Sequence, residues 1–121
     1  MPARILLVED VEDIRVATAE ALSHAGYAVS TAANAAAALV LLADEPAPDL
    51  LFTDIVLGAG MNGYALAERA LQARQGLRIL YTSGYPGTAR DKPAGAPLAR
   101  LLLKPYRAAD VIQAVAQLLL A

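Results

Sequence analysis

The sequence predicts an α/β protein built on a doubly wound parallel sheet of five strands, with helices on both faces. Short, continuous apolar runs alternate along the chain with stretches of helical periodicity. This alternation is typical of right-handed crossovers between parallel strands. The 121 residues, 57% of them hydrophobic, are enough for one folded domain, which we expect to span residues 1–121.

Five segments are expected to form the strands. Four of them are continuous apolar runs, the pattern of a strand that is covered on both faces. The remaining segment, "YAVSTA", is more polar and begins at Tyr27. In chain order, the expected strands span residues 4–8, 27–32, 49–54, 77–83 and 99–103.

Helical periodicity fills the segments between these strands. A first helix is expected over residues 11–25, with Gly26 as its C-terminal cap. Asn34 precedes an alanine-rich second helix, which Pro46 and Pro48 must end. Two further helices are expected over residues 63–75, before Gly76, and over residues 107–119. The expected apolar face of the first helix comprises Val11, Ile14, Ala17, Ala21, Leu22 and Ala25.

One stretch breaks the alternation. Residues 85–97, "YPGTARDKPAGAP", lie between the last two expected strands and are rich in proline and glycine. Proline lacks the backbone donor that a helix interior needs, so a regular helix of ordinary length is not expected. The fourth helix of the alternation should therefore be short or irregular.

Composition excludes several classes of function. The net charge is −2 and the ten basic residues are dispersed, so no basic stripe is available for direct nucleic-acid binding. The chain has no cysteine, which removes thiolate chemistry and fits a reducing compartment. The first residues turn acidic too early for a signal peptide, and no apolar run reaches membrane-spanning length. We therefore expect a cytoplasmic protein without a membrane partner.

Polar residues follow four of the expected strands. The crevice of a parallel sheet forms at the carboxyl ends of its strands, so these side chains should meet there. The residues are Glu9 and Asp10 after the first strand, Asp54 and Ser83 at the ends of the third and fourth, and Lys104 after the fifth.

The adjacent acids Glu9 and Asp10 predict a bound cation, because two negative charges at close range repel each other and a cation between them cancels this repulsion. Carboxylate oxygens suit Mg²⁺, which takes few protein ligands. With the ammonium of Lys104 and the hydroxyl of Ser83, they make a site suited to phosphoryl transfer. Asp54 is the expected nucleophile, because carboxylates can form aspartyl phosphates.

With these residues in place, the chain resembles a receiver domain of the two-component response-regulator family. The matching motifs are "LLVED", "FTDIVL", "MNGYALA", "YTSGY" and "LLLKPY", in family order over nearly the whole chain. Two of them, "TDIVLGAGMNGYALAERA" and "YTSGY", look like receivers attached to hybrid sensor kinases as well as stand-alone receivers. The resemblance implies a flavodoxin-like fold with strand order 2-1-3-4-5.

The resemblance also implies roles for the site residues. Asp54 would accept a phosphoryl group from a histidine of a kinase or phosphotransfer protein. Glu9 and Asp10 would hold Mg²⁺ together with Asp54 and the backbone carbonyl of Val56. Ser83 would be the switch hydroxyl, Lys104 would pair with the phosphoryl group, and Pro105 would follow a cis peptide bond.

As a receiver, the domain would be a phosphoacceptor signalling switch and not an enzyme, catalysing only its own phosphorylation and dephosphorylation. Its output would pass through an effector protein or a covalently linked kinase, with the domain itself a monomer or weak dimer. Two rival functions remain: a flavodoxin-like nucleotide-binding protein and a docking module that works without phosphorylation. The anionic loop "EDVED" lacks the glycines of a phosphate cradle, which counts against the first.

Several positions depart from the family pattern or have a second interpretation. Some family members use an aromatic side chain, Tyr or Phe, as a rotamer switch in the last strand, three residues before the lysine. Here that position is Leu101, and Tyr106, which follows the proline, is not equivalent to it. By the resemblance, Val56 and Tyr85 would occupy the positions that flank the path of water to the phosphoryl group, so hydrolysis should be slower than in relatives with polar residues there. The switch hydroxyl could be Thr82 instead of Ser83. His24 is expected to be a surface residue near a helix end, without a catalytic role.

Overall fold

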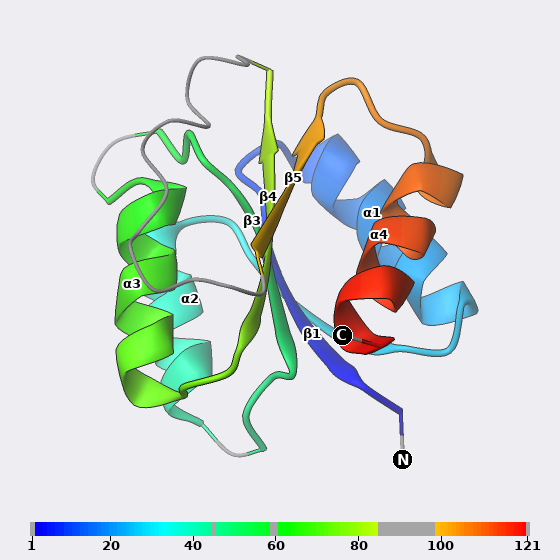
Figure 1. The fold of residues 1–121 in the computed structure, drawn as a ribbon. Coiled ribbons are helices and arrows are strands. Elements are labelled where there is room, and N and C mark those ends of the chain that lie inside the picture. The colour runs from blue at the N-terminus through cyan, green and yellow to red at the C-terminus, as the bar shows by residue number, and fades with distance from the viewer. Residues whose placement is uncertain (1, 45, 59–60, 85–98, 121) are drawn as a thin grey trace.

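The computed structural model describes residues 2–44, 46–58, 61–84 and 99–120 (Figure 1). The predicted irregular stretch 85–97, including Tyr85, lies outside these ranges. Five parallel strands form one sheet in the order β2-β1-β3-β4-β5, which confirms the predicted topology. The strands are β1 (Arg4–Val8), β2 (Ala28–Ala32), β3 (Leu50–Asp54), β4 (Arg78–Ser83) and β5 (Ala99–Leu103).

Helices cover both faces of the sheet, as the alternation predicted. Helices α1 (Glu12–His24) and α4 (Ala108–Leu120) lie together on one face (Figure 1). Helices α2 (Ala35–Ala43) and α3 (Gly63–Ala73) lie together on the other face. Within the described ranges, no helix combines the length and the apolar character that crossing a membrane would require.

Local signals set the helix boundaries to within one or two residues of those predicted. The side chain of Asn34 caps α2 by accepting a hydrogen bond from the Ala37 amide at 2.8 Å. Gly26 and Gly76 adopt the left-handed backbone (φ 101° and 85°) that the predicted caps need. Helix α3 ends at Ala73, two residues earlier than expected.

The sheet has a separate apolar cluster on each face, because successive strand side chains point to opposite sides. Nearly all residues of β1, β3 and β4 are buried, which explains their continuous apolar sequences. The cluster under α2 and α3 contains Leu6, Val8, Leu51, Ile79 and Tyr81, among others. The cluster under α1 and α4 contains Ile5, Leu7, Leu50, Phe52 and Leu80.

The apolar face predicted for α1 was only partly right, since Leu22 is buried and Ile14 and Ala21 are half-buried. The buried residues of this helix are Thr18 and Leu22, whereas Val11 is 45% exposed and Ala17 is exposed. The pattern of apolar residues could not indicate Thr18, which is polar. It faces inward because its hydroxyl shares a hydrogen bond with the Tyr106 hydroxyl, at 3.3 Å.

Candidate functional site

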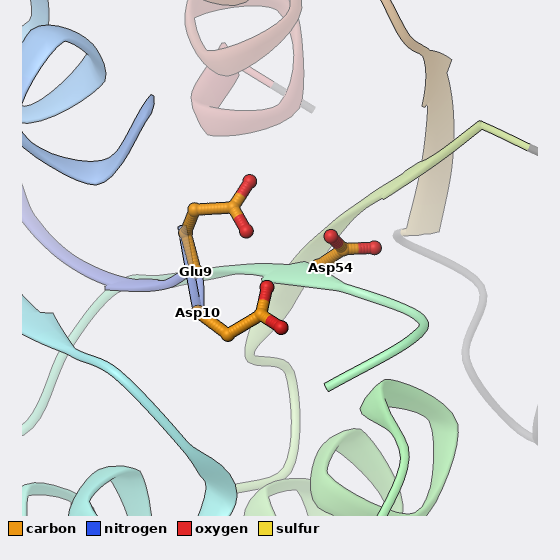
Figure 2. Close-up of side chains that lie close together, drawn as sticks. All are labelled: Glu9, Asp10 and Asp54. Carbon is orange, nitrogen blue, oxygen red and sulfur yellow. The ribbon is translucent and has the colours of Figure 1, made fainter. Parts of the chain in front are cut away.

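Three carboxylates meet at the carboxyl edge of the sheet. Glu9 directly follows β1 and Asp54 ends the neighbouring strand β3, and each is nearly fully buried. Asp10 is exposed. One carboxylate oxygen from each residue lies within 4.8 Å of the others, and Figure 2 shows the three side chains around a common space. The sequence-predicted acids therefore lie together in a geometry that can hold a cation.

Lys104 bridges two of these acids. Its Nζ donates to Glu9 Oε1 at 2.9 Å and to Asp54 Oδ2 at 2.6 Å. The lysine follows β5, so its side chain extends past the end of β4 to reach Asp54 at the end of β3 and Glu9 just after β1. The peptide bond from Lys104 to Pro105 is cis, as the family resemblance implied. Lys104 is therefore held in the site and is not a freely solvated surface lysine.

Burial and charge act against each other in this cluster. Burial raises the pKa of Glu9 above its ordinary range, and the hydrogen bond from Lys104 only partly offsets this. Burial alone would lower the pKa of Lys104, but its hydrogen bonds to Asp54 and Glu9 raise it instead. The lysine is therefore a permanent ammonium at physiological pH, and buried Glu9 depends on positive charge nearby.

Glu9 is also fixed by the start of α1. Its Oε2 accepts a hydrogen bond from the Val11 amide at 3.3 Å, and its backbone carbonyl accepts from the Arg15 guanidinium at 2.9 Å. No sequence motif singled out Arg15, because its contact is with a backbone carbonyl, six residues earlier in the chain, and a backbone group gives no side-chain signal in the sequence.

The backbone after Asp54 is held by α3. The Gly63 amide donates to the Ile55 carbonyl at 2.8 Å. A Cβ atom at Gly63 would lie 2.2 Å from the Asp54 carbonyl oxygen, so only glycine allows this approach. The Val56 amide donates to Asp54 Oδ1 at 3.2 Å, which orients the carboxylate. The Val56 side chain is 49% exposed, and the role of its carbonyl stays a prediction.

Ser83 and Thr82, the two candidates for the switch hydroxyl, end β4 and are both buried. Thr82 is the strand partner of Asp54, and its hydroxyl has no hydrogen-bond partner among the described residues. The Ser83 carbonyl accepts a hydrogen bond from the Lys104 amide at 2.9 Å, which ties the end of β4 to the lysine. The choice between the two hydroxyls stays open and is a matter for mutagenesis.

The other singled-out residues lie away from the carboxylates. His24 is exposed in the last turn of α1, at the end of the helix remote from Glu9. Leu101 is half-buried in β5 and packs against the cluster under α2 and α3. Tyr106 packs on the opposite face of the sheet, so it is not a substitute for an aromatic residue at position 101.

The chain is similar to known receiver proteins in both sequence and structure. The response regulator receiver protein CpdR of Brucella abortus (strain 2308) is 38% identical to it, with 98% of each protein covered. A response regulator receiver protein from Sinorhizobium medicae WSM419 has a crystal structure with a TM-score of 0.89 and 30% identity, covering 99% of this chain and 96% of that one. The sensor kinase CckA of B. abortus is 29% identical over 97% of this chain, which spans 12% of the kinase.

A doubly wound sheet with carboxylates and a bridging lysine at its carboxyl edge defines the class of flavodoxin-like phosphoacceptor switches. The model of the response regulator receiver domain family matches residues 5–116. This chain belongs to that family, and the resemblance seen in its motifs is confirmed.

Proposed function

We propose that Asp54 accepts a phosphoryl group from a phosphohistidine of a kinase or phosphotransfer protein, in a reaction that depends on Mg²⁺. The observation that carries this proposal is the Lys104 ammonium, 2.9 Å from Glu9 and 2.6 Å from Asp54. A fixed cation beside a buried carboxylate offers charge neutralisation to an incoming phosphoryl group.

The transfer forms one bond and breaks another. A carboxylate oxygen of Asp54 attacks phosphorus, and the phosphorus–nitrogen bond of the donor breaks with its electron pair passing to the imidazole. Before the donor arrives, Oδ1 is held by the Val56 amide and Oδ2 by Lys104. Fixing both oxygens in advance lowers the entropic part of the barrier.

The donor set fits Mg²⁺, since it consists of hard carboxylate oxygens within 4.8 Å of one another. Glu9, Asp10 and Asp54 would hold the ion together with the Val56 carbonyl. When bound, Mg²⁺ supplies positive charge that offsets the charge of the phosphoryl oxygens. The exposed Asp10 carboxylate lies on the solvent side of the cluster and leaves the site accessible.

After transfer, Lys104 pairs with a phosphoryl oxygen and the Ser83 hydroxyl donates a hydrogen bond to another. These local changes in charge move strand ends and loops, and a partner protein reads the movement. The domain catalyses only its own phosphorylation and dephosphorylation. Similarity to a receiver protein covered over 98% of its length and to part of a sensor kinase supports a switch that is either free-standing or joined to a kinase, and we expect it to act in the cytoplasm.

The test is phosphorylation of the purified protein by acetyl phosphate with Mg²⁺, followed by intact mass. The wild type should gain one phosphoryl group, and Asp54→Asn should gain none. Asp44→Asn is the matched control, because it neutralises an exposed aspartate after α2 that lies near Arg4 and Ala28, at the edge of the sheet opposite the site. A chelator should also abolish the gain.

If the wild type gains no phosphoryl group, the proposal is wrong and the docking module that works without phosphorylation becomes the favoured function. Nucleotide or flavin binding by that unmodified protein would instead favour the flavodoxin-like alternative. Phosphorylation of Asp54→Asn at the wild-type rate would place the acceptor elsewhere.

A further inference from the structure

Tyr106 connects the segment after Lys104 with two other elements. Its hydroxyl shares a hydrogen bond with the Thr18 hydroxyl of α1, at 3.3 Å. Its ring lies 6.1 Å from the ring of Phe52 between centroids, at a tilt of 50°. Phe52 precedes Asp54 by two residues on the same face of β3. A single side chain thus touches both α1 and the strand that carries the phosphoacceptor.

The side chain of Lys104 has room to move, so a neighbouring residue that is itself fixed would help to hold it. Lysine has a long flexible stem, and Lys104 borders an open groove of about 420 Å³ together with Ile14, Pro105 and Tyr106. The lysine side chain is 23% exposed. Packing around the stem alone therefore leaves room for the ammonium to swing away from its two carboxylates.

The Tyr106 hydroxyl also lies in the electric field of the site. Its pKa is raised, first by burial, and the carboxylates of Glu9 and Asp54 add to the increase. The hydrogen bond with Thr18 and the charge of Lys104 act in the opposite direction. The phenol consequently stays neutral and able to donate a hydrogen bond over the physiological pH range.

We propose that Tyr106 is a positioning residue which, anchored by Thr18 and Phe52, holds the Lys104 ammonium between Glu9 and Asp54. This inference rests on the proposed function, since the lysine acts on the phosphoryl group. Leu101, which packs on the other face of the sheet at the position of the family's aromatic rotamer switch, is aliphatic. Here an aromatic residue instead controls the lysine segment from the side of α1.

The first experiment measures the rate of phosphorylation by acetyl phosphate with Mg²⁺. Tyr106→Phe and Thr18→Val each remove one hydroxyl while keeping the shape of the side chain. Each should slow phosphorylation about two- to tenfold, the equivalent of one lost hydrogen bond. The double variant should be no slower than the slower single variant, because both changes remove the same contact.

Two control variants separate positioning from a general effect on folding. Thr18→Ser keeps the hydroxyl and should restore the wild-type rate, which a purely packing role for Thr18 would not allow. Tyr27→Phe removes a hydroxyl at the start of β2, at the opposite end of the sheet, and should also react at the wild-type rate. Thermal unfolding of each variant tests whether it is folded.

The second experiment does not depend on phosphorylation. In the wild type, the ion pairs should slow proton exchange enough for the Lys104 ammonium to give its own ¹H–¹⁵N NMR signal. The signal should persist in Thr18→Ser and broaden in Tyr106→Phe and Thr18→Val.

The two experiments distinguish failure of this inference from failure of the proposed function. If the wild type is not phosphorylated but the lysine signal broadens in the two variants, the proposed function fails and the positioning role stands. If the variants keep both the wild-type rate and a sharp signal, the positioning role is overturned. Multiplicative rate losses in the double variant would also overturn it.

Discussion

At the scale of single residues, the site depends on one cation placed between two buried acids. Lys104 lies 2.9 Å from Glu9 and 2.6 Å from Asp54, while Asp10 faces solvent. A buried ion pair is held in place because loss of either partner leaves an uncompensated charge. The cluster is therefore organised before any phosphoryl group arrives.

The raised pKa of Glu9 predicts a pH dependence of stability. A carboxyl whose pKa is higher in the folded than in the unfolded protein binds its proton more tightly when folded. Its contribution to the free energy of unfolding therefore falls as the pH rises from the ordinary value of 4.5 through the raised folded value. In chelator, the difference in unfolding free energy between wild type and Glu9→Gln should follow this trend in urea titrations. A difference that is constant up to neutral pH would contradict it.

The two hydroxyls at the end of β4 predict different mutational effects, one on stability and one on the rate of phosphorylation. The Thr82 hydroxyl is buried without a partner among the described residues, so Thr82→Val should be neutral or stabilising by about 1 kcal/mol. Ser83→Ala should slow phosphorylation about tenfold, because it removes a hydrogen bond to a charged group. Urea unfolding and acetyl phosphate kinetics check the two effects. A slow Thr82→Val with a normal Ser83→Ala would assign the switch to Thr82.

The residues of the acidic cluster could be predicted from sequence because each occupies the end of a strand. Glu9, Asp54 and Lys104 are each set by one local pattern, an apolar run followed by a polar residue. Thr18 and Tyr106 could not be found in this way. They are 88 positions apart in the chain, and only packing of α1 against the segment after β5 brings their hydroxyls together.

At the scale of the elements, the packing of α3 against the end of β3 positions Asp54. Gly63→Ala should destabilise the fold by about 1–3 kcal/mol, because its Cβ would lie 2.2 Å from the Asp54 carbonyl oxygen. The higher helix propensity of alanine is too small to compensate. Thermal unfolding measures the effect. Gly84→Ala is the matched control, since a Cβ there meets no atom of the described residues within 4 Å, and equal melting of the two variants would refute the steric explanation.

Strand positions were more predictable than the orientation of a helix. The buried strands are continuous apolar runs, and their observed ends differ from those predicted by at most one residue. The buried face of α1 was predicted only in part: Leu22 is buried as expected, but Thr18 was missed because its burial depends on a hydroxyl from another element. A polar residue that is satisfied by a distant partner gives no signal in the local pattern of hydrophobicity.

At the scale of the whole molecule, strand alternation alone indicated a parallel sheet but not the order of its strands. The order β2-β1-β3-β4-β5 was implied only by the family motifs, and it is what puts β1 beside β3. This adjacency brings the acids after β1 against Asp54. The site is therefore a property of the complete sheet.

Binding of Mg²⁺ should stabilise the whole domain, because only the folded chain gathers the three carboxylates. At a hundredfold excess over the dissociation constant, the free energy of unfolding should rise by about 2.7 kcal/mol. Asp10→Asn should lose most of this gain, although without metal it should melt at or above the wild-type temperature, since one like charge is removed. Asp13→Asn, an exposed acid in the first turn of α1, is the control. Equal metal stabilisation of wild type and Asp10→Asn in thermal melts would place the ion elsewhere.

The ion pair between Glu9 and Lys104 joins residues 95 positions apart in the chain. During synthesis on the ribosome, Glu9, Asp10 and Asp54 emerge before Lys104 does. A nascent chain therefore presents Glu9 and Asp54 without the ammonium that pairs with them, and the charge cluster is completed only once β5 and Lys104 have been synthesised.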